Sequence, residues 1–328
     1  MAIGSFGLTH ARFTSSAGNL HNTFAAATHF IPPIAQTLVI NEVLSTIKCG
    51  TSTKNQWIEI WNGYANPINL QDWFIEDGAN PPNKLQIVNS NTSLPAHQFA
   101  LLSKDGSTWS SCYKPVPSGV VTAQLGGQID INTGVLRLLD NQSHIIDRIE
   151  FGTASARLNS LAGQSIERKI LGEDSATGDT FNANDFTLRY SPTAGFALPQ
   201  IQTVVINEFL PHPISGSDWI ELYNSSSSAQ SIASWKLIDS TGGIIATLSG
   251  SLAPHTWTTR DVSNRLNNGG DTVELIDNGG VIQDIFYYFS DPGIGVSIGR
   301  YPDGNNTWGT FSIPTEGIIN GVPTTTLP

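Results

Sequence analysis

Two groups of residues have types and spacings that could carry out catalysis, and the first is a serine motif. Gly295-Val296-Ser297-Ile298-Gly299 fits the G-x-S-x-G pattern of a serine-hydrolase elbow. An elbow needs a strand that turns sharply into a helix, so that the serine hydroxyl is exposed beside a histidine. The residues that follow, 300–304 (RYPDG), are a turn sequence and not the start of a helix. We therefore interpret Ser297 as a strand residue.

The second group consists of glutamates that recur in the two halves of the chain, namely Glu42, Glu59, Glu208 and Glu221. Two carboxylates about 5–9.5 Å apart in a substrate cleft would suit glycoside hydrolysis. The face of a β-sandwich offers no such cleft. We expect instead that one glutamate of each set forms a structural ion pair with Arg168 or Arg300, which would join the first strand to a late strand. The sequence thus predicts no catalytic residue and no enzyme.

Metal binding has only weak candidates. The seven histidines form neither H-x-H nor H-E-x-x-H, and His97 and His255 recur inside a Pro-containing turn, which favours turn packing. An acidic loop offers the oxygen donors that Ca²⁺ prefers; its members are Asp174, Asp179, Asn182, Asn184 and Asp185. Their spacing matches no known Ca²⁺ loop, so we prefer a solvated surface loop, with Ca²⁺ as the alternative. No other cofactor is expected.

Two kinds of covalent modification are suggested by the sequence. Cys49 and Cys112 lack the C-x-x-C spacing of a zinc site, which leaves a disulfide or two free thiols, depending on the redox compartment. Four asparagines stand in N-x-S/T sequons, namely Asn91, Asn141, Asn224 and Asn305. These are glycosylation candidates in a secreted protein, although an Asn/Ser/Thr-rich chain also contains sequons by chance.

Composition limits the possible partners and compartment. The net charge is −11, and the 16 Lys and Arg residues form no run, which argues against nucleic-acid binding. No stretch of 18 apolar residues is present, so we expect no membrane-spanning helix. Charged residues make up only 13% of the chain, so its surface must be rich in Ser, Thr and Asn, as is common in extracellular β-proteins. We expect a secreted or cell-surface location.

The elements that position these residues occur twice. The matching segments keep the same order in both halves, and they are VINE at 39–42 and 205–208, WIEIWN and WIELYN at 57–62 and 219–224, a Trp-centred segment at 70–77 and 232–239, LPAH and LAPH at 94–97 and 252–255, VLRLLDN and VELIDN at 135–141 and 273–278, SIER and SIGR at 165–168 and 297–300, and P-T-x-G at 192–195 and 314–317. The segments are short, β-branched or aromatic, and bounded by turn residues, which predicts strands. In 57–61 we expect Ile58 and Ile60 on one face and Glu59 on the other.

Short strands at this spacing indicate β-sandwiches. We therefore predict an all-β fold with an N-terminal arm at 1–35, one sandwich at 36–198 and a second at 201–328. The repeated segments together resemble the lamin tail domain. This resemblance implies an Ig-like sandwich and, in prokaryotes, a secreted or surface protein that binds or assembles. The first copy departs from the pattern by inserts near 79–92, 105–130 and 169–188.

The arm supplies a second resemblance. Its pattern A-x-F-T-S-S at 11–16, followed by N-T-F-x-A-x-T at 22–28, is similar to the mature start of camelysin/TasA-like secreted fibre proteins. Met1–Ala11 lacks the charged start of a complete secretory signal and is compatible with a remnant of one. Alternate residues from Leu20 to Phe30 give a half-apolar pattern, as in a strand. We expect the apolar arm residues to contact a neighbouring subunit, and they are Phe13, Leu20, Phe24 and Phe30.

Three functions follow from these features. The first is a structural subunit of an extracellular filament or surface layer, in which the arm of one copy adds as a strand to the next copy, head to tail. The second is a secreted adhesin that recognises a glycan or another surface ligand. The third is an accessory part of a secreted hydrolase.

Overall fold

A computed structural model describes residues 37–47, 56–88, 92–104, 120–127, 134–155, 158, 160, 162–174, 180–199 and 201–327. The regular elements in these ranges are β-strands, apart from two short 3-10 turns, η3 (Gly152–Ala154) and η4 (Ala183–Asp185). Neither is long or apolar enough to cross a membrane. The all-β prediction is confirmed. The chain divides into two units, residues 1–33 and 34–328, and the predicted arm lies outside the described residues.

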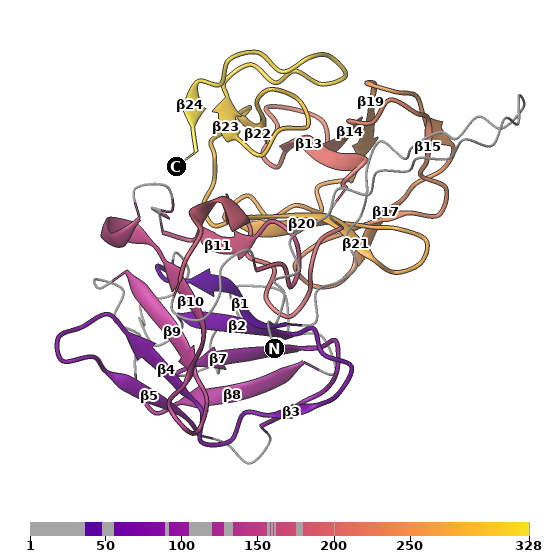
Figure 1. Cartoon of the computed structure of the whole chain (residues 1–328). Helices are drawn as coiled ribbons and strands as arrows, with labels where there is room; N and C mark the ends of the chain where they lie inside the picture. Colours follow the sequence, from indigo (N-terminus) through magenta and orange to yellow (C-terminus); the bar gives the residue numbers. More distant parts are fainter. Residues whose placement is uncertain are drawn as a thin grey trace, which may run out of the picture. The chain divides into compact units, whose positions relative to one another are not determined.

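The first half of the larger unit forms a sandwich that can be followed in Figure 1. Its strands are β1 (Leu38–Leu44), β2 (Trp57–Asn62), β3 (Ile68–Asn69), β4 (Phe74–Asp77), β5 (Lys84–Val88), β6 (Ser93–Leu94), β7 (Phe99–Ser103), β8 (Val121–Leu125), β9 (Val135–Leu139), β10 (Ile145–Glu150), β11 (Ser165–Arg168) and β12 (Phe186–Arg189). One layer is β7-β2-β1-β11-β12 and the other is β10-β9-β4-β5. Strand β8 pairs with both β7 and β5, so it joins the layers into one ten-stranded sheet.

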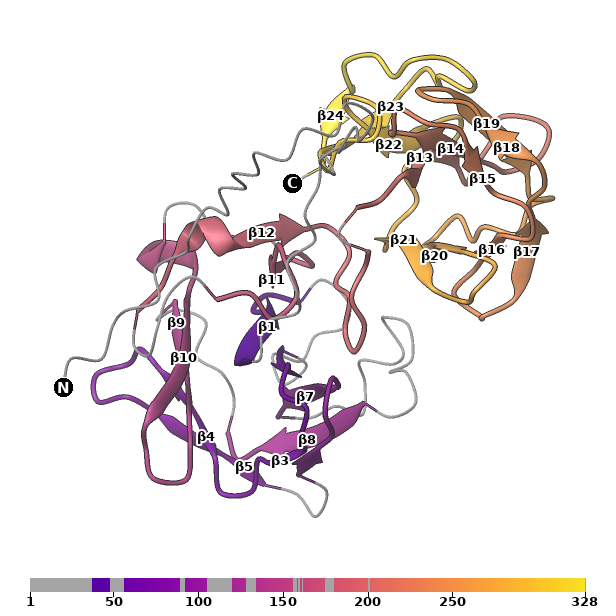
Figure 2. The same ribbon diagram turned by 45° about the vertical axis from the view of Figure 1, so that its right-hand side comes forward.

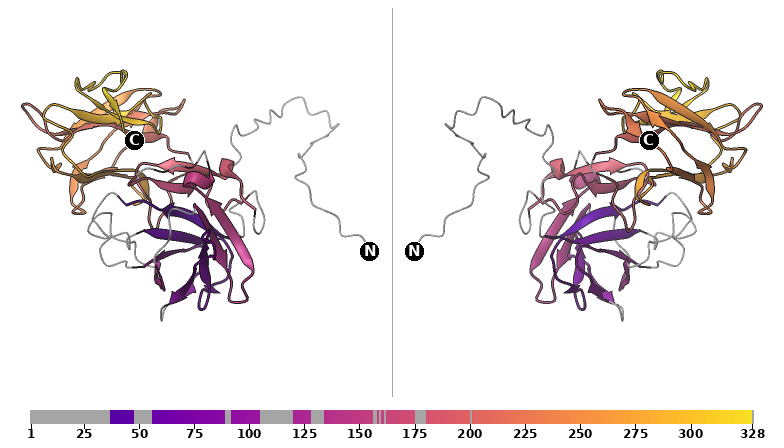
Figure 3. Two further views of the ribbon diagram at one scale, coloured as in Figure 1. Left: turned by 90° about the vertical axis from the view of Figure 1, so that its left-hand side faces the viewer. Right: turned by 90° about the vertical axis from the view of Figure 1, so that its right-hand side faces the viewer.

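The second half repeats this plan without a counterpart of β8 (Figures 2 and 3). Its strands are β13 (Val204–Leu210), β14 (Trp219–Asn224), β15 (Gln230–Ser231), β16 (Lys236–Ile238), β17 (Ile244–Thr247), β18 (Ser251–Leu252), β19 (Trp257–Asp261), β20 (Asp271–Ile276), β21 (Ile282–Tyr288), β22 (Ser297–Arg300), β23 (Trp308–Phe311) and β24 (Thr325–Thr326). One sheet is β19-β14-β13-β22-β23-β24, and the other is β17-β16-β20-β21. The two sheets remain separate.

Each sandwich has its own hydrophobic core. Ten of the residues that the strand pattern predicts as core are buried, namely Ile40, Ile58, Ile60, Leu136, Leu138, Ile206, Ile220, Leu222, Val273 and Leu275. Trp73 and Trp235, also predicted as core, are half-buried and pack against it. Both faces of β2 are buried, although its alternating pattern predicts only one buried face. Trp57 and Glu59, on the face opposite Ile58 and Ile60, are also fully buried. Ala194 of the closing P-T-x-G turn lies in the same cluster as Trp57, so that turn helps to cover the second face.

Replacement of Ile220 by Ala tests the core of the second sandwich. Its side chain is 0% exposed, and its loss leaves a cavity, so we expect the free energy of unfolding to fall by about 2–4 kcal/mol. Ile244→Ala is the matched control, because Ile244 is 51% exposed in β17. Chemical denaturation measures both variants. Equal small losses would mean that the faces of β14 are assigned incorrectly.

Candidate functional site

The recurring polar residues gather around a β-bulge that both opening strands contain. The pairing of β1 with β2 shifts register between Ile40 and Glu42, and that of β13 with β14 shifts between Ile206 and Glu208. Residues two apart in a strand normally share a face, and an extra residue reverses this alternation. Ile40 therefore belongs to the core, while Glu42 faces the other way, and the second copy repeats the arrangement.

In the first sandwich an arginine and an aspartate bind the main chain next to this bulge. Arg168 in β11 forms a buried ion pair with Asp147 in β10, with 2.8 Å between Nη2 and Oδ2. Arg168 Nε also donates to the carbonyl of Ile40 at 2.9 Å, and the Ile40 N–H donates to Asp147 Oδ2 at 2.6 Å. Because β10 and β11 belong to different layers, the pair joins those layers to the opening strand.

The second sandwich repeats this interaction. Arg300 in β22 pairs with Asp284 in β21, with 2.7 Å between Nη2 and Oδ2. Arg300 Nε donates to the Ile206 carbonyl at 2.7 Å, and the Ile206 N–H donates to Asp284 Oδ2 at 2.9 Å. Arg300 Nη1 donates to the carbonyl of Asn305 at 2.7 Å, which holds the following turn. The guanidinium also lies 4.6 Å from the centroid of the Trp308 ring, within range of a cation–π interaction.

The prediction that a glutamate pairs with Arg168 or Arg300 is therefore wrong. Glu42 receives its hydrogen bond from Ser165, and consecutive strand residues point to opposite faces. Arg168 lies three residues after Ser165 in β11, so its side chain points to the opposite face, on which Asp147 lies. The sequence carried a signal for the true partners, because Asp147 and Asp284 occupy matching places in the repeat.

The glutamates instead bind the turn that closes each sandwich. In the first, Glu42 and Glu59 are partners in the β1–β2 register. Thr193 of the closing P-T-x-G turn donates to Glu42 through its N–H at 3.1 Å and its hydroxyl at 2.8 Å. The Gly195 N–H donates to Glu59 Oε2 at 2.6 Å, and Asn41 Nδ2 in the bulge donates to Oε1 at 2.8 Å.

The second sandwich uses the same contacts. The Thr315 N–H donates to Glu208 Oε1 at 3.0 Å, and its hydroxyl donates to Oε2 at 2.6 Å. The Gly317 N–H donates to Glu221 Oε2 at 2.6 Å, and Asn207 Nδ2 donates to Oε1 at 2.8 Å. Sequence reasoning missed the asparagine and threonine of this cluster, although both recur in the VINE and P-T-x-G segments.

Burial dominates the electrostatics of these carboxylates. Burial raises the pKa of Glu42 and of Glu59, and the nearby charge of Glu42 adds to the increase for Glu59. In the second sandwich burial raises the pKa of Glu221 to about 7, against the lowering effect of the bonds from Asn207 and Gly317. A raised carboxyl pKa is also common at catalytic sites. Here both oxygens of each glutamate accept hydrogen bonds from the protein itself, so their geometry serves the closing turn.

The serine motif also has a structural role. Ser297 is buried in β22, and its hydroxyl donates to Glu208 Oε1 at 2.5 Å. Its counterpart Ser165 makes the same bond to Glu42. The interpretation of Ser297 as a strand residue is confirmed. His97 and His255 lie in turns with positive φ and contact Trp61 and Tyr223, in agreement with turn packing.

The acidic loop, for which Ca²⁺ binding was the alternative to a solvated surface loop, is described only in part. Asp174 accepts a hydrogen bond from Arg168 Nη1 at 3.4 Å, and Asp185 accepts one from Asn182 at 3.3 Å. Asp179 lies outside the described residues. Within the part of the chain that the structure describes, no group of three or more His, Cys, Asp or Glu residues could hold a metal ion.

The modification candidates differ in accessibility. Asn141 and Asn305 are exposed in turns. Asn224 is 0% exposed, and its Nδ2, the atom that would carry a glycan, donates to the carbonyls of Ser228, Leu252 and Ala253. Glycosylation of Asn224 is therefore excluded in the folded protein. The remaining predicted residues lie outside the described ranges, namely Asn91, Cys49, Cys112, Phe13, Leu20, Phe24 and Phe30.

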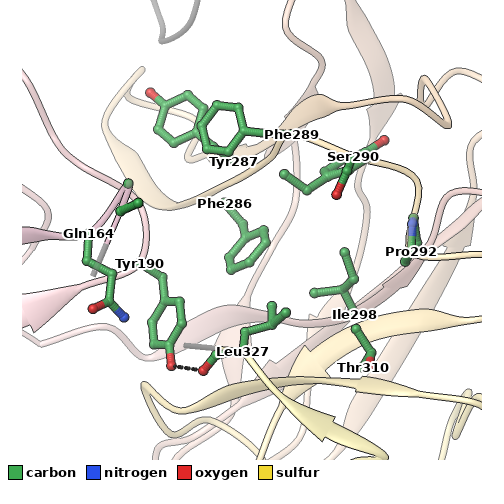
Figure 4. Close-up of a pocket in the computed structure, with 13 residues that line it drawn as sticks. Gln164, Tyr190, Phe286, Tyr287, Phe289, Ser290, Pro292, Ile298, Thr310 and Leu327 are labelled. Carbon is green, nitrogen blue, oxygen red and sulfur yellow. Dashed lines mark hydrogen bonds between the residues drawn. The ribbon is translucent and has the colours of Figure 1, made fainter. Parts of the chain in front are cut away.

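One pocket is too small to hold a typical small-molecule substrate. Its lining includes Tyr190, Phe286, Ile298 and Leu327 (Figure 4). Its volume is about 100 Å³, below the roughly 300 Å³ at which small-molecule sites begin. The Tyr190 hydroxyl donates to the Leu327 carbonyl at 2.6 Å across it. This contact holds the end of the chain in place.

Glu221 gives the second sandwich a pH-dependent stability. Its pKa is raised from 4.5 to about 7, so the folded state binds the proton more tightly than the unfolded state. Its contribution is complete below about pH 4.5 and is lost as the pH rises through 7, by roughly 3 kcal/mol. We expect Glu221→Gln to flatten the dependence of unfolding free energy between pH 5 and 8. The exposed Glu316→Gln is the control and should leave the wild-type slope unchanged.

Asp284→Asn tests the arginine–aspartate pair. The change leaves the Arg300 guanidinium buried without an anion, so we expect a loss of about 3–5 kcal/mol in unfolding free energy. Thermal and urea denaturation provide the measurement. A loss below 1 kcal/mol would show that the second sandwich does not depend on this pair.

Comparison with known proteins agrees with this architecture. Residues 198–289, which include β13 to β21, match the family model described as Lamin Tail Domain. No curated protein matches the chain. Among solved structures, exo-chitosanase CsxA from Amycolatopsis orientalis has 14% identity and a TM-score of 0.19, covering 74% of this chain and 26% of that one. A structure of exo-beta-D-glucosaminidase CsxA gives the same values. This chain thus spans about a quarter of those proteins, and TM-scores this low carry no argument.

The family match and the structure agree on the second sandwich. It has the opening VINE strand, the Trp-centred strand and the hairpin of β20 and β21 within the matched range. The first sandwich repeats the same polar contacts with its own residues. Residues 198–289 of this chain thus match the lamin tail domain, and this match agrees with an Ig-like sandwich and suggests a binding or structural module.

Proposed function

We propose that this protein is a non-catalytic structural subunit of an extracellular filament or surface layer. In this proposal the N-terminal arm, residues 1–35, adds as a strand to a sandwich of the next subunit. The supporting observation is that the sheets end in strands with one free edge. Among the described residues, the terminal strands β10, β12, β19, β24, β17 and β21 each pair on one side only. An edge strand presents unpaired N–H and C=O groups to which another chain can add.

The recurring carboxylates support a role without catalysis. The carboxylate oxygens of Glu208 and Glu221 accept hydrogen bonds from Thr315, Gly317 and Asn207. The matching glutamates of the first sandwich accept the same hydrogen bonds. An acid–base pair acting on a substrate would need a cleft and at least one free oxygen. Two copies of one arrangement, each bonded to its own closing turn, are explained by folding alone.

The arm suits a joining element. The chain divides into residues 1–33 and a second unit, residues 34–328, that contains both sandwiches. Each sandwich has its own opening strand, β1 or β13, which the arm does not have to supply. Strand addition in a head-to-tail manner uses different surfaces of the two partners and does not close, so it produces filaments.

A second candidate function is glycan binding by an adhesin, and one observation favours it. Tyr223 and Trp257 lie side by side on the β14–β19 face with ring centroids 5.5 Å apart, and both are only half-buried. Their counterparts Trp61 and Phe99 are buried, at 5% and 7% exposure. Asp303 accepts a hydrogen bond from Trp257 Nε1 at 3.0 Å beside this pair. Half-exposed aromatic rings beside a carboxylate suit a sugar.

Changes in the arm test the assembly proposal. Deletion of residues 1–35 should leave two folded sandwiches and abolish filaments, as seen by electron microscopy and light scattering. In the full-length chain, Phe24→Asp should also abolish assembly, because an unpaired charge enters an apolar site only at a cost of several kcal/mol. Ala25→Asp is the matched control, because residue 25 lies on the opposite face of an extended strand and should tolerate the charge. A monomeric wild-type protein would refute the proposal and favour the adhesin.

A further inference from the structure

The two sandwiches differ at the position that β8 occupies in the first, and among the described residues this position is open in the second. In the first, β8 runs parallel to β7, with Ala100 opposite Val121 and Leu102 opposite Ala123. Its other edge pairs with β5, where Ile87 is opposite Leu125. Strand β8 thus fills the position between the ends of the two layers, and the figures show it beside β7 (Figures 1 and 2).

The second sandwich contains the flanking strands but not the strand between them. Strand β19 pairs with β14 as β7 pairs with β2, so Thr258 corresponds to Ala100 and Arg260 to Leu102. Strand β17 corresponds to β5, because the Leu248 N–H bonds to Trp235 as the Ile87 N–H bonds to Trp73. Residues 201–327 are all described, and none of them pairs with the outer edge of β19 or β17.

The outer edge of β19 carries main-chain groups ready for pairing. Asn224 N–H donates to the Thr256 carbonyl, so Thr258 and Arg260, at every second position, also bond toward β14. The N–H and C=O groups of Thr259 therefore point away from β14. A side chain partly covers them, since Arg260 Nη1 donates to the Thr259 carbonyl at 2.8 Å. Charged side chains on edge strands are a common protection against indiscriminate pairing.

Strand β8 shows what kind of segment fits this position. Val121, Ala123 and Leu125 are buried, while Thr122 and Gln124 are exposed, so the pattern is large, small, large on the inner face. The arm contains a partly similar run in 24–30, FAAATHF, in which alternate residues place Phe24, Ala26, Thr28 and Phe30 on one face, with Ala26 at the small position and Thr28 where β8 has Leu125. The 36 residues before Thr37 can extend to about 120 Å, which is enough to reach another molecule.

We infer that residues 24–30 of one copy occupy, parallel to β19 of the next copy, the position that β8 holds beside β7. This inference rests on the proposed function and names its acceptor. A parallel orientation follows from the β7–β8 template. It also requires that the Arg260 side chain release the Thr259 carbonyl, so that the incoming strand can donate to it.

Photo-cross-linking in the full-length protein tests the contact directly. Benzoylphenylalanine replaces Asp261, the exposed last residue of β19, in one batch of protein. This batch is mixed with isotope-labelled wild type, assembled and irradiated, and mass spectrometry identifies the joined peptides. The inference predicts cross-links from residue 261 to labelled residues within 20–34. The control places the same probe at Thr326 in the edge strand β24, where no cross-link to the arm is expected.

A backbone variant tests the same edge without a probe. Thr259→Pro removes the outward N–H and leaves the bonds to β14 intact, because proline is tolerated where the N–H of an edge strand faces solvent. Loss of one ladder bond and the bulk of the ring should raise the concentration needed for assembly about tenfold or more. Thr259→Val keeps the N–H and should assemble like wild type. Circular dichroism melting confirms that both variants are folded.

The outcomes separate the inference from the proposed function. Cross-links from residue 261 to the arm, with weaker assembly of Thr259→Pro, support both. Filaments whose arm cross-links to Thr326 and not to residue 261 overturn the inference and leave the proposed function standing. Arm cross-links confined to one isotope batch show that the arm folds back on its own chain, which overturns both. If Thr259→Pro does not fold, the cross-linking result decides alone.

Discussion

The buried arginine–aspartate pair is the interaction on which each sandwich depends. It satisfies both main-chain groups of the residue before the bulge and connects strands of both layers. Burying two charges is costly, and replacement by apolar residues is often neutral for stability. What the pair adds here is register. The bulge shifts β1 by one residue against β2, and a slip would move every side chain of that strand to the wrong face.

The glutamate cluster depends on that register. Only with the bulge in place do Ile40 and Val43 both enter the core while Glu42 turns to the other face. There Glu42 and Glu59 meet the N–H groups of the closing turn, which would otherwise be buried without partners. The pKa of Glu59 is raised because burial and the neighbouring charge of Glu42 disfavour its ionised form. The N–H groups of the closing turn nevertheless need both carboxylates as acceptors. The closing segment is thereby tied to the first two strands.

Much of this architecture could be predicted from the sequence, because the two copies of the repeat keep the residues that have the same structural role in each sandwich. Strand existence, core faces and the structural role of Ser297 follow from period-two patterns and turn residues. The partner of Arg168 could not be derived from these patterns, since alternation says which face a residue occupies only if no bulge intervenes. Asp147 lies in another layer, and its distance to Arg168 is set by how the layers pack. Strand β8 was missed for a different reason: it lies within the insert near 105–130 and has no counterpart in the second copy.

The absence of that counterpart within 201–327 changes what the second sandwich can do. In the first sandwich Leu102, opposite Ala123 of β8, is buried in the core, whereas the second has Arg260 at this place, half-buried and bonded to its own strand. A leucine there would leave an apolar edge exposed, and such edges promote aggregation. The arginine keeps the edge soluble and covers the Thr259 carbonyl with one hydrogen bond, which is weak enough for a strand with several ladder bonds to displace. The edge is therefore protected against random contacts while it stays open to a segment that supplies a complete strand.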